Sequence, residues 1–249
     1  MNNVIKSEWY KLRKDRSLWT LLIILIVISL SYPLLIIFDE GADTIAVNDF
    51  YRQTILGGNN YIIRLVPCVL GGFFISSEYA MGTMKSIVAS GNSRVRIYFA
   101  KLMVYSIGAI LIAFVFPFVF TGAVAIFLHF NGMPTLSYFA STVGLTALYT
   151  IAFASIMALF ATIFTESGKA IGFMLFFFLL LDSLLYTLSH FFPVFEVVFN
   201  SSIFKLFLDI GRIETIHGAE LVQLIMMPII TFIVFGILGS IVFQKKEIK

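Results

Sequence analysis

Few residues in this sequence have the types and the spacing that covalent chemistry needs. The chain has no G-x-x-x-x-G-K-[ST] phosphate-binding loop, no H-E-x-x-H zinc motif and no G-x-S-x-G nucleophile elbow. Its three histidines, His129, His190 and His217, lack ligand spacing to one another and to Cys68. We therefore expect no catalytic residue, no bound cofactor and no metal site in this chain.

Two oppositely charged residues, Arg64 and Asp182, fall inside apolar stretches. An ionised side chain inside a bilayer is costly, so each is a candidate functional residue that needs a partner. Both lie in the outer half of the spans predicted below, and we expect them to pair. Arg64 lies within a turn of the outer end of its span, close enough to snorkel to the interface. A structural ion pair, or a protonated and hydrogen-bonded Asp182, is favoured over proton coupling.

The third candidate is a polar segment, Glu78–Arg94, with the sequence EYAMGTMKSIVASGNSR between two long apolar runs. Its first part, Glu78–Ala89, is long enough for about three helical turns. A Ser-Gly-Asn sequence would end that helix, and Ser93 would cap the amino end of the next one. A simple connector needs only a few residues. The segment is either an ordinary basic loop or an extra surface helix that a partner protein contacts, and its length favours the helix.

Composition places these residues in a membrane protein. The 249 residues are 59% apolar and 12% charged, with a mean hydropathy of +0.98. Soluble domains have about twice that charged fraction. A hydrocarbon core of about 30 Å takes about 20 helical residues to cross. We predict an all-α membrane protein with one transmembrane domain over residues 1–249 and six spans near 18–38, 61–77, 102–129, 138–165, 170–190 and 221–243.

The basic residues predict the orientation of these spans. Thirteen of the seventeen Lys and Arg residues lie in the amino-terminal segment, the loop after the second span, the link after the fourth span or the carboxyl-terminal tail. The positive-inside rule then places both termini in the cytoplasm. Because these charges line membrane edges rather than a folded polar surface, no nucleic-acid partner is expected. Membrane lipid is the expected surrounding of the spans, and the single cysteine excludes intramolecular disulfides.

Residues 1–17 are predicted to form an amphipathic helix at the membrane interface. Ile5, Trp9 and Leu12 share one face at i, i+4, i+7 spacing, while Arg13 and the neighbouring lysines fall away from it. A basic helix with a Trp on its apolar side can lie in the interface of a lipid bilayer. The alternative is a basic flank that only orients the first span.

Two further segments lie on the predicted outer side. Residues 39–60 contain four acidic residues and a Gly-Gly-Asn-Asn sequence, which together predict a solvated connecting loop. Residues 191–220 mix aromatic with charged residues and are too polar to span the membrane, yet too apolar for a free loop. Short helices that fold back into the outer leaflet, as in re-entrant segments, fit this composition best.

The motif E-Y-x-x-G-T-x-K after the second span, followed by S-R, carries a family resemblance. Together with the six spans, the basic amino-terminal helix and the aromatic segment before the last span, it resembles the ABC transporter type-2 permease family. Within that family the chain is most similar to the small permeases of bacitracin and lantibiotic self-protection exporters. The residues of the motif are Glu78, Tyr79, Gly82, Thr83, Lys85, Ser93 and Arg94.

The resemblance implies a role for each segment. Residues 78–94 would be the coupling loop, whose helix docks into a cleft of a separate cytoplasmic ABC ATPase subunit that binds ATP and Mg²⁺. Trp9, Leu12 and Arg13 of the amino-terminal helix would form a second contact with that ATPase. Residues 191–220 would be an outer re-entrant hairpin that helps to close the exit. Two ATPase copies and a second permease chain, identical or paralogous, would complete the transporter in the bacterial plasma membrane.

The implied function is that of a permease subunit of an ATP-driven exporter, without an ATP site or enzymatic activity of its own. An amphipathic or antimicrobial peptide is the expected substrate, and sodium, a lipid or a cytolytic peptide are alternatives. From other classes, a non-transporting sensory or anchoring subunit and a small intramembrane enzyme using Asp182, Glu166 or the histidines also stay open. Such an enzyme would act alone, whereas a permease needs an ATPase partner.

Overall fold

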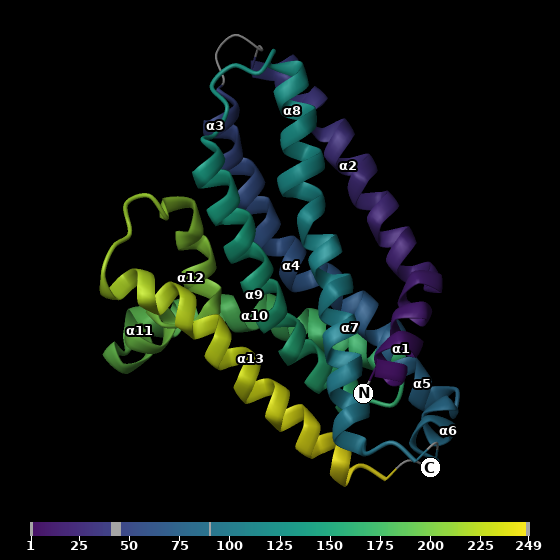
Figure 1. The fold of residues 1–249 in the computed structure, drawn as a ribbon. Coiled ribbons are helices and arrows are strands. Elements are labelled where there is room, and N and C mark those ends of the chain that lie inside the picture. The colour runs from purple at the N-terminus through teal and green to yellow at the C-terminus, as the bar shows by residue number, and fades with distance from the viewer. Residues whose placement is uncertain (1, 41–45, 90, 248–249) are drawn as a thin grey trace.

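The structure, a computed structural model, describes residues 2–40, 46–89 and 91–247 (Figure 1). All regular elements in these ranges are helices. Six helical stretches within them are long and apolar enough to cross a membrane: Arg16–Leu35, Val47–Ala80, Arg94–Phe127, Leu136–Ile163, Ser167–Phe191 and Ala219–Lys245. The predicted all-α architecture with six spans is confirmed, and the chain is described below as a multi-pass membrane protein.

The first half of the chain contains three spans. Helix α1 (Asn2–Lys14) precedes the first spanning helix, α2 (Arg16–Glu40). The second span is a nearly continuous rod of α3 (Val47–Phe50), α4 (Leu56–Gly71) and α5 (Ser77–Ala80), joined by π-helical segments at Tyr51–Ile55 and Gly72–Ser76. The short helix α6 (Thr83–Ala89) leads to the third span, made of α7 (Arg94–Val115), a π-helical segment at Phe116–Phe120 and α8 (Thr121–Phe127).

The second half begins with the fourth and fifth spans, α9 (Leu136–Ile163) and α10 (Ser167–Phe191). Three short helical elements follow: α11 (Pro193–Asn200), α12 (Ile203–Asp209) and a 3-10 turn at Ile210–Arg212. The last span is α13 (Ala219–Lys245).

The second span begins roughly four turns earlier than the sequence indicates. The loop predicted over residues 39–60 is wrong for most of that range, because the chain is helical up to Glu40 and again from Val47 onward; residues 41–45 lie outside the described part. Packing overrides the Gly-Gly-Asn-Asn turn signal. Asn59 is fully buried, and Gly58 allows the Phe116 ring to lie 3.3 Å from the position a Cβ atom would occupy.

The centre of the bundle consists of α4, α7 and α9, which pack on one another. More than half of the residues in the central apolar stretch of the second, third and fourth spans are buried, whereas in α2, α10 and α13 fewer than a quarter of them are. Figure 1 shows α4, α7 and α9 side by side, with α13 crossing obliquely along α9. The exposed apolar faces of α2, α10 and α13 are therefore available to lipid or to another membrane subunit.

Hydrogen bonds from buried tyrosines connect these helices. Pro228 lacks the N–H that would bond the Leu224 carbonyl within α13, and the Tyr149 hydroxyl of α9 donates to that carbonyl at 2.9 Å. The Tyr105 hydroxyl of α7 donates to the Pro67 carbonyl of α4 at 2.7 Å. Each bond pairs polar groups that water does not reach, so it stabilises the bundle more than a surface bond would.

Between α10 and α13 the chain forms the short helices α11 and α12 and a 3-10 turn. Helix α11 buries none of its residues, whereas α12 packs several apolar side chains against the spans: Ile203, Phe204, Leu206 and Phe207. The Phe204 ring lies against Phe153 of α9, with the two ring centroids 5.4 Å apart. The segment thus folds back on the bundle, while its depth in a bilayer and its part in an exit stay predictions.

Candidate functional site

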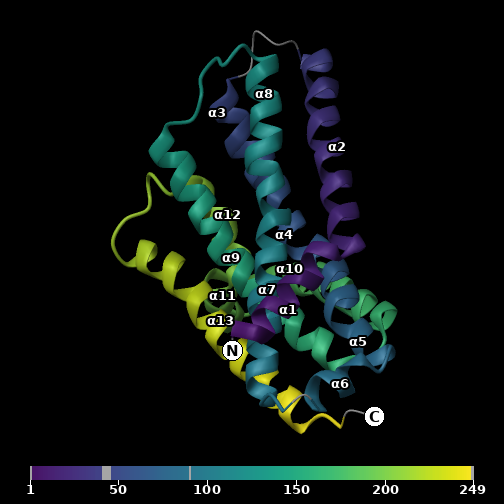
Figure 2. The same ribbon diagram turned by 45° about the vertical axis from the view of Figure 1, so that its right-hand side comes forward.

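The polar segment predicted from the sequence lies at the end of the bundle that also holds α1 and the last turn of α13 (Figures 1 and 2). This end is termed the termini end below. Helix α5 finishes the second span at Ala80, a turn occupies Met81 and Gly82, and α6 follows. The single helix predicted over Glu78–Ala89 is therefore wrong, because it is broken after Ala80 and only Thr83–Ala89 forms a separate surface helix.

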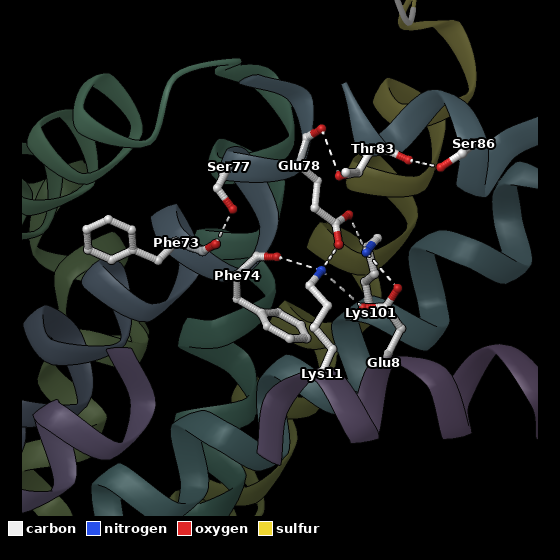
Figure 3. A network of polar contacts seen from close by, with 9 residues as sticks. All are labelled: Glu8, Lys11, Phe73, Phe74, Ser77, Glu78, Thr83, Ser86 and Lys101. Carbon is white, nitrogen blue, oxygen red and sulfur yellow. Dashed lines mark hydrogen bonds and ion pairs between the residues drawn. The ribbon is translucent and has the colours of Figure 1, made fainter. Parts of the chain in front are cut away.

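Gly82 accounts for this break. Its φ of +71° lies in the left-handed region, which glycine adopts without the steric penalty of a Cβ atom. The Gly82 N–H donates to the Tyr79 carbonyl at 3.2 Å, and the Thr83 hydroxyl donates to the Glu78 carbonyl at 3.3 Å (Figure 3). These bonds satisfy carbonyls that the end of α5 leaves without helical partners. The Gly-Thr pair of the motif thus ends one helix and starts the next.

Helix α6 is attached to the bundle by Met84, with Ile87 and Val88 half-buried against the core, and its other side chains are exposed to solvent. Met84 is fully buried, whereas Gly82, Thr83 and Lys85 are exposed. Met81, in the turn before α6, is also exposed and offers a flexible apolar side chain. An anchored helix with a polar outer face and an exposed methionine is a surface that another protein can contact.

Glu78 points away from this surface, into a buried cluster of four charges (Figure 3). The Lys101 Nζ lies 2.7 Å from a Glu8 carboxylate oxygen and 2.5 Å from a Glu78 oxygen. Lys11 pairs with Glu78, approaches Glu8 at 3.7 Å and donates to the Phe74 carbonyl at 3.3 Å. Glu8, Lys11, Glu78 and Lys101 are termed the charge cluster below. It joins α1, the end of the second span and the beginning of the third.

Three members of the charge cluster are almost inaccessible to solvent, with exposed fractions of 4% for Glu8 and 2% each for Glu78 and Lys101. Removing a charge from water costs several kcal/mol, and contacts between two acids and two bases offset that cost. Lys11 lies at the rim of the cluster. Burial, followed by the nearby charge of Lys101, lowers its pKa to about 7. The pKa of Lys11 is therefore closer to neutral pH than that of an ordinary lysine.

The charge cluster changes the roles expected for two residues. Glu78, which the resemblance places in the contact with the ATPase, is enclosed within the permease itself. Lys101 follows the start of the third span, where a basic side chain ordinarily reaches for the interface, yet it turns inward to two carboxylates. The Glu78 side chain is therefore enclosed in this conformation, and its part in the contact with an ATPase stays a prediction.

Sequence reasoning missed Glu8. The apolar face predicted for α1 is wrong at one position, because Leu12 and Glu8 are buried while Trp9 is exposed. Leu12, expected to contact the ATPase, instead packs in the core, and Trp9 and Arg13 remain on the free face. Lys101 was the available signal, since a basic residue within a largely apolar run needs an acidic partner nearby.

Ser93 and Arg94 begin the third span. The Ser93 hydroxyl accepts the Arg96 N–H at 3.4 Å, so the predicted amino-terminal cap is present. The Arg94 guanidinium donates to carbonyls at the end of α13, at 2.8 Å to Gln244 and 2.7 Å to Lys246. A cation at this position satisfies terminal carbonyls and complements the helix dipole. Arg94 therefore connects α7 to α13 instead of standing free for a partner.

Tyr79 forms a second connection to the carboxyl-terminal segment. The Lys246 Nζ lies 3.8 Å from the centroid of the Tyr79 ring. It also donates to the carbonyls of Thr162 and Ile163 at the end of α9, the latter at 3.1 Å. Burial lowers the pKa of Lys246 to about 8. The ends of α5, α9 and α13 are thus held together behind α6.

Arg64 and Asp182 form the ion pair expected from the sequence, with the Arg64 Nη1 2.7 Å from an Asp182 carboxylate oxygen. Snorkelling of Arg64 to the interface does not occur, because the side chain is buried with only 2% of the residue exposed. The early start of the second span at Val47 places Arg64 deep within a long helix rather than near its end. Among the described residues, no group of three or more His, Cys, Asp or Glu residues is placed to bind a metal ion.

A bundle of six membrane-spanning helices with a small surface helix at one end has the architecture of a transporter's membrane subunit. The family model described as "ABC-2 family transporter protein" matches residues 4–181, more than two thirds of the chain, and the chain belongs to this family. The match covers most of α1, all of α6, Arg64 and the whole charge cluster, and it ends one residue before Asp182. A comparison with curated proteins found no match. Membership makes this chain the membrane subunit of an ABC transporter, a class that works with an ATPase partner.

Proposed function

We propose that this chain is the permease subunit of an ATP-driven exporter, and that α6 is the helix through which a cytoplasmic ATPase acts on it. The observation that carries the proposal is the contact between an exposed helix and a closed ionic network. Thr83, the first residue of α6, bonds the carbonyl of Glu78, whose side chain lies in the charge cluster. A displacement of α6 would therefore reach α1 and both adjoining spans together.

The proposal places the termini end in the cytoplasm, as the distribution of basic residues favours. Two copies of the ATPase would bind ATP and Mg²⁺, and this chain would bind neither. A second permease chain, identical or paralogous, would share the transport pathway. The exposed apolar faces of α2, α10 and α13 support such a partner, and they would be divided between it and membrane lipid.

The proposed substrate is an amphipathic or antimicrobial peptide of the bacitracin or lantibiotic type, exported across the bacterial plasma membrane to give resistance. The resemblance in sequence supports this class, and sodium, a lipid or a cytolytic peptide are the alternatives. The α11–α12 segment would help to close the exit. Deleting the permease should lower the minimal inhibitory concentration of at least one such peptide in a susceptibility panel, and an unchanged panel would contradict the peptide class.

Docking through α6 is tested by co-purification of the ATPase with permease variants. Lys85→Glu reverses an exposed charge on α6 and should weaken ATPase binding by about tenfold or more. The matched control is Lys169→Glu, because Lys169 is an exposed lysine that follows the end of α9 and pairs only locally with Glu166. Equal retention of the ATPase by both variants would contradict docking through α6.

A second variant separates docking from transmission. Glu78→Gln leaves the outer face of α6 unchanged but removes a charge from the charge cluster. We expect this variant to retain the ATPase while losing most substrate-stimulated ATP hydrolysis. Loss of ATPase binding in Glu78→Gln without unfolding would show that Glu78 supports the docking surface itself rather than the transmission of movement.

A further inference from the structure

Arg64 is fixed firmly within the bundle. Its Nε donates to the Asn60 carbonyl at 3.0 Å, and its Cζ lies 5.2 Å and 5.6 Å from the ring centroids of Tyr61 and Phe204. Helix α4, which carries Arg64, belongs to the central group of helices. An arginine stays protonated at any physiological pH. The site around Arg64 therefore requires an anion at all times.

Asp182 supplies that anion from a helix that leaves the bundle. The buried face of α10 consists of Ala170, Met174 and Phe178 at four-residue spacing, and Asp182 is the next position on this face. Beyond Asp182 no residue of α10 is buried, and α11 buries none either. The Asp182 side chain is itself 30% exposed. The carboxylate thus lies just beyond the last fully buried residue of α10, Phe178.

We propose that Arg64 binds the anionic head of a membrane-embedded amphiphile, and that Asp182 is the internal anion that occupies Arg64 when no such ligand is bound. The head group is an oxyanion, either a carboxylate or a phosphate, because the planar guanidinium presents paired N–H donors that match both. The apolar tail lies along the exposed face of α10, which includes Leu179 and Tyr186. This inference rests on the proposed export function and narrows its substrates to compounds that carry an anionic group.

Exchange between Asp182 and a ligand keeps the guanidinium paired throughout. An unpaired arginine in apolar surroundings is strongly unfavourable, so α10 cannot simply move away from α4. An incoming oxyanion removes that barrier, and α10 then moves as its own carboxylate is released to the exposed side. The exposed Tyr61 ring marks the open edge of the site beside Arg64. Ligand binding and movement of α10 are therefore coupled by a single anion position.

The test measures binding of radiolabelled palmitate to the full-length permease in phosphatidylcholine nanodiscs. Hexadecyl phosphate serves as the second anion and hexadecanol as the neutral control. Asp182→Asn removes the competing anion and should bind palmitate at least about tenfold more tightly than the wild type. The double variant Arg64→Gln/Asp182→Asn leaves no unpaired charge at this site, and it should bind palmitate no better than it binds hexadecanol.

The opposite effects of these two variants distinguish a ligand site from a purely structural ion pair. The proposal would be overturned if the Asp182→Asn variant bound palmitate no more tightly than the wild type. It would also be overturned if hexadecanol displaced palmitate. Displacement by hexadecyl phosphate supports a site for either oxyanion, and displacement by unlabelled palmitate alone supports a carboxylate site.

If Asp182→Asn does not fold, comparison of the wild type with the double variant decides between a ligand site and a purely structural ion pair. Selective loss of palmitate binding in the double variant supports the proposal, and equal binding overturns it. The assay contains no ATPase, so a negative result leaves docking through α6 intact. Failure of the Lys85→Glu test would in turn overturn the proposed function without altering the binding result.

Discussion

The permease holds two sets of buried charges in different ways. The charge cluster at the termini end is closed by three segments, and its two acids are almost fully inaccessible. In the pair of Arg64 and Asp182, α10 alone supplies the carboxylate, which is partly exposed. A closed network moves as a unit, since opening it strands several charges. A pair with one loosely held partner can exchange that partner. The first arrangement suits transmission of movement and the second suits recognition.

The largest effect is expected from breaking the charge cluster. Lys101→Met keeps the length of the side chain but leaves the two acids, Glu8 and Glu78, with only Lys11 as a partner. The free energy of unfolding in detergent should fall by about 3–5 kcal/mol. Lys169→Met, which affects only the exposed pair with Glu166, is the control and should change it by less than about 1 kcal/mol. Similar losses in the two variants would show that the network does not hold the helices together.

Breaking the intramembrane pair should cost less and should depend on which partner is removed. Asp182→Ala strands a buried guanidinium and should lower the free energy of unfolding by about 1–3 kcal/mol. Arg64→Ala should cost less, because the Asp182 carboxylate that it leaves unpaired is partly exposed to solvent. The same unfolding measurement compares both variants. A larger loss of unfolding free energy in Arg64→Ala than in Asp182→Ala would contradict the view that Arg64 is the fixed partner and Asp182 the movable one.

Arg94→Ala should have an intermediate effect confined to the termini end. The variant loses hydrogen bonds to the final carbonyls of α13, which should cost about 1–2 kcal/mol. Hydrogen exchange should increase in the last turns of α13 and stay unchanged around Arg64. The control is Arg96→Ala, because Arg96 is a neighbouring arginine that is exposed. Unchanged hydrogen exchange in α13 would show that the bonds from Arg94 do not hold the end of α13 in place.

Gly82→Ala should have the smallest effect. Nothing lies within 4 Å of the added Cβ atom, so the cost of about 1 kcal/mol comes from the positive φ alone. Gly57→Ala, also in open space but inside a helix, should be neutral or stabilising. Unfolding curves of the two variants test this difference. A stabilised Gly82→Ala would show that the break between α5 and α6 does not depend on the left-handed glycine.

Several features of this fold can be predicted from the sequence because they depend on composition or on contacts between residues close in the chain. Six apolar runs suffice for six spans. Ser93 caps the third span through a bond within three residues. The pairing of Arg64 with Asp182 follows because few other charges lie within the apolar runs, and each charge needs a partner.

Other features depend on how distant helices approach one another, which no local pattern contains. Glu8 is buried because α1 packs against α7, and periodicity alone favoured Trp9 for that face. Asn59 remains helical because its surroundings are packed, although its local sequence predicts a turn. Arg94 and Tyr79 meet the carboxyl-terminal segment more than 140 residues away. The candidate site could therefore be located from the sequence, while the direction of its side chains could not.

The central claim, that α6 receives the action of an ATPase, is most directly tested by site-specific cross-linking. Cys68 is fully buried, so a cysteine introduced in place of Lys85 offers an accessible thiol without competition. In membranes containing both subunits, Lys85→Cys should cross-link to the ATPase. Met133→Cys, exposed in the turn between α8 and α9 at the opposite end, should instead react with an impermeant reagent added outside the cell. Labelling of Lys85→Cys from outside, or an active complex in which it forms no cross-link to the ATPase, would contradict the account.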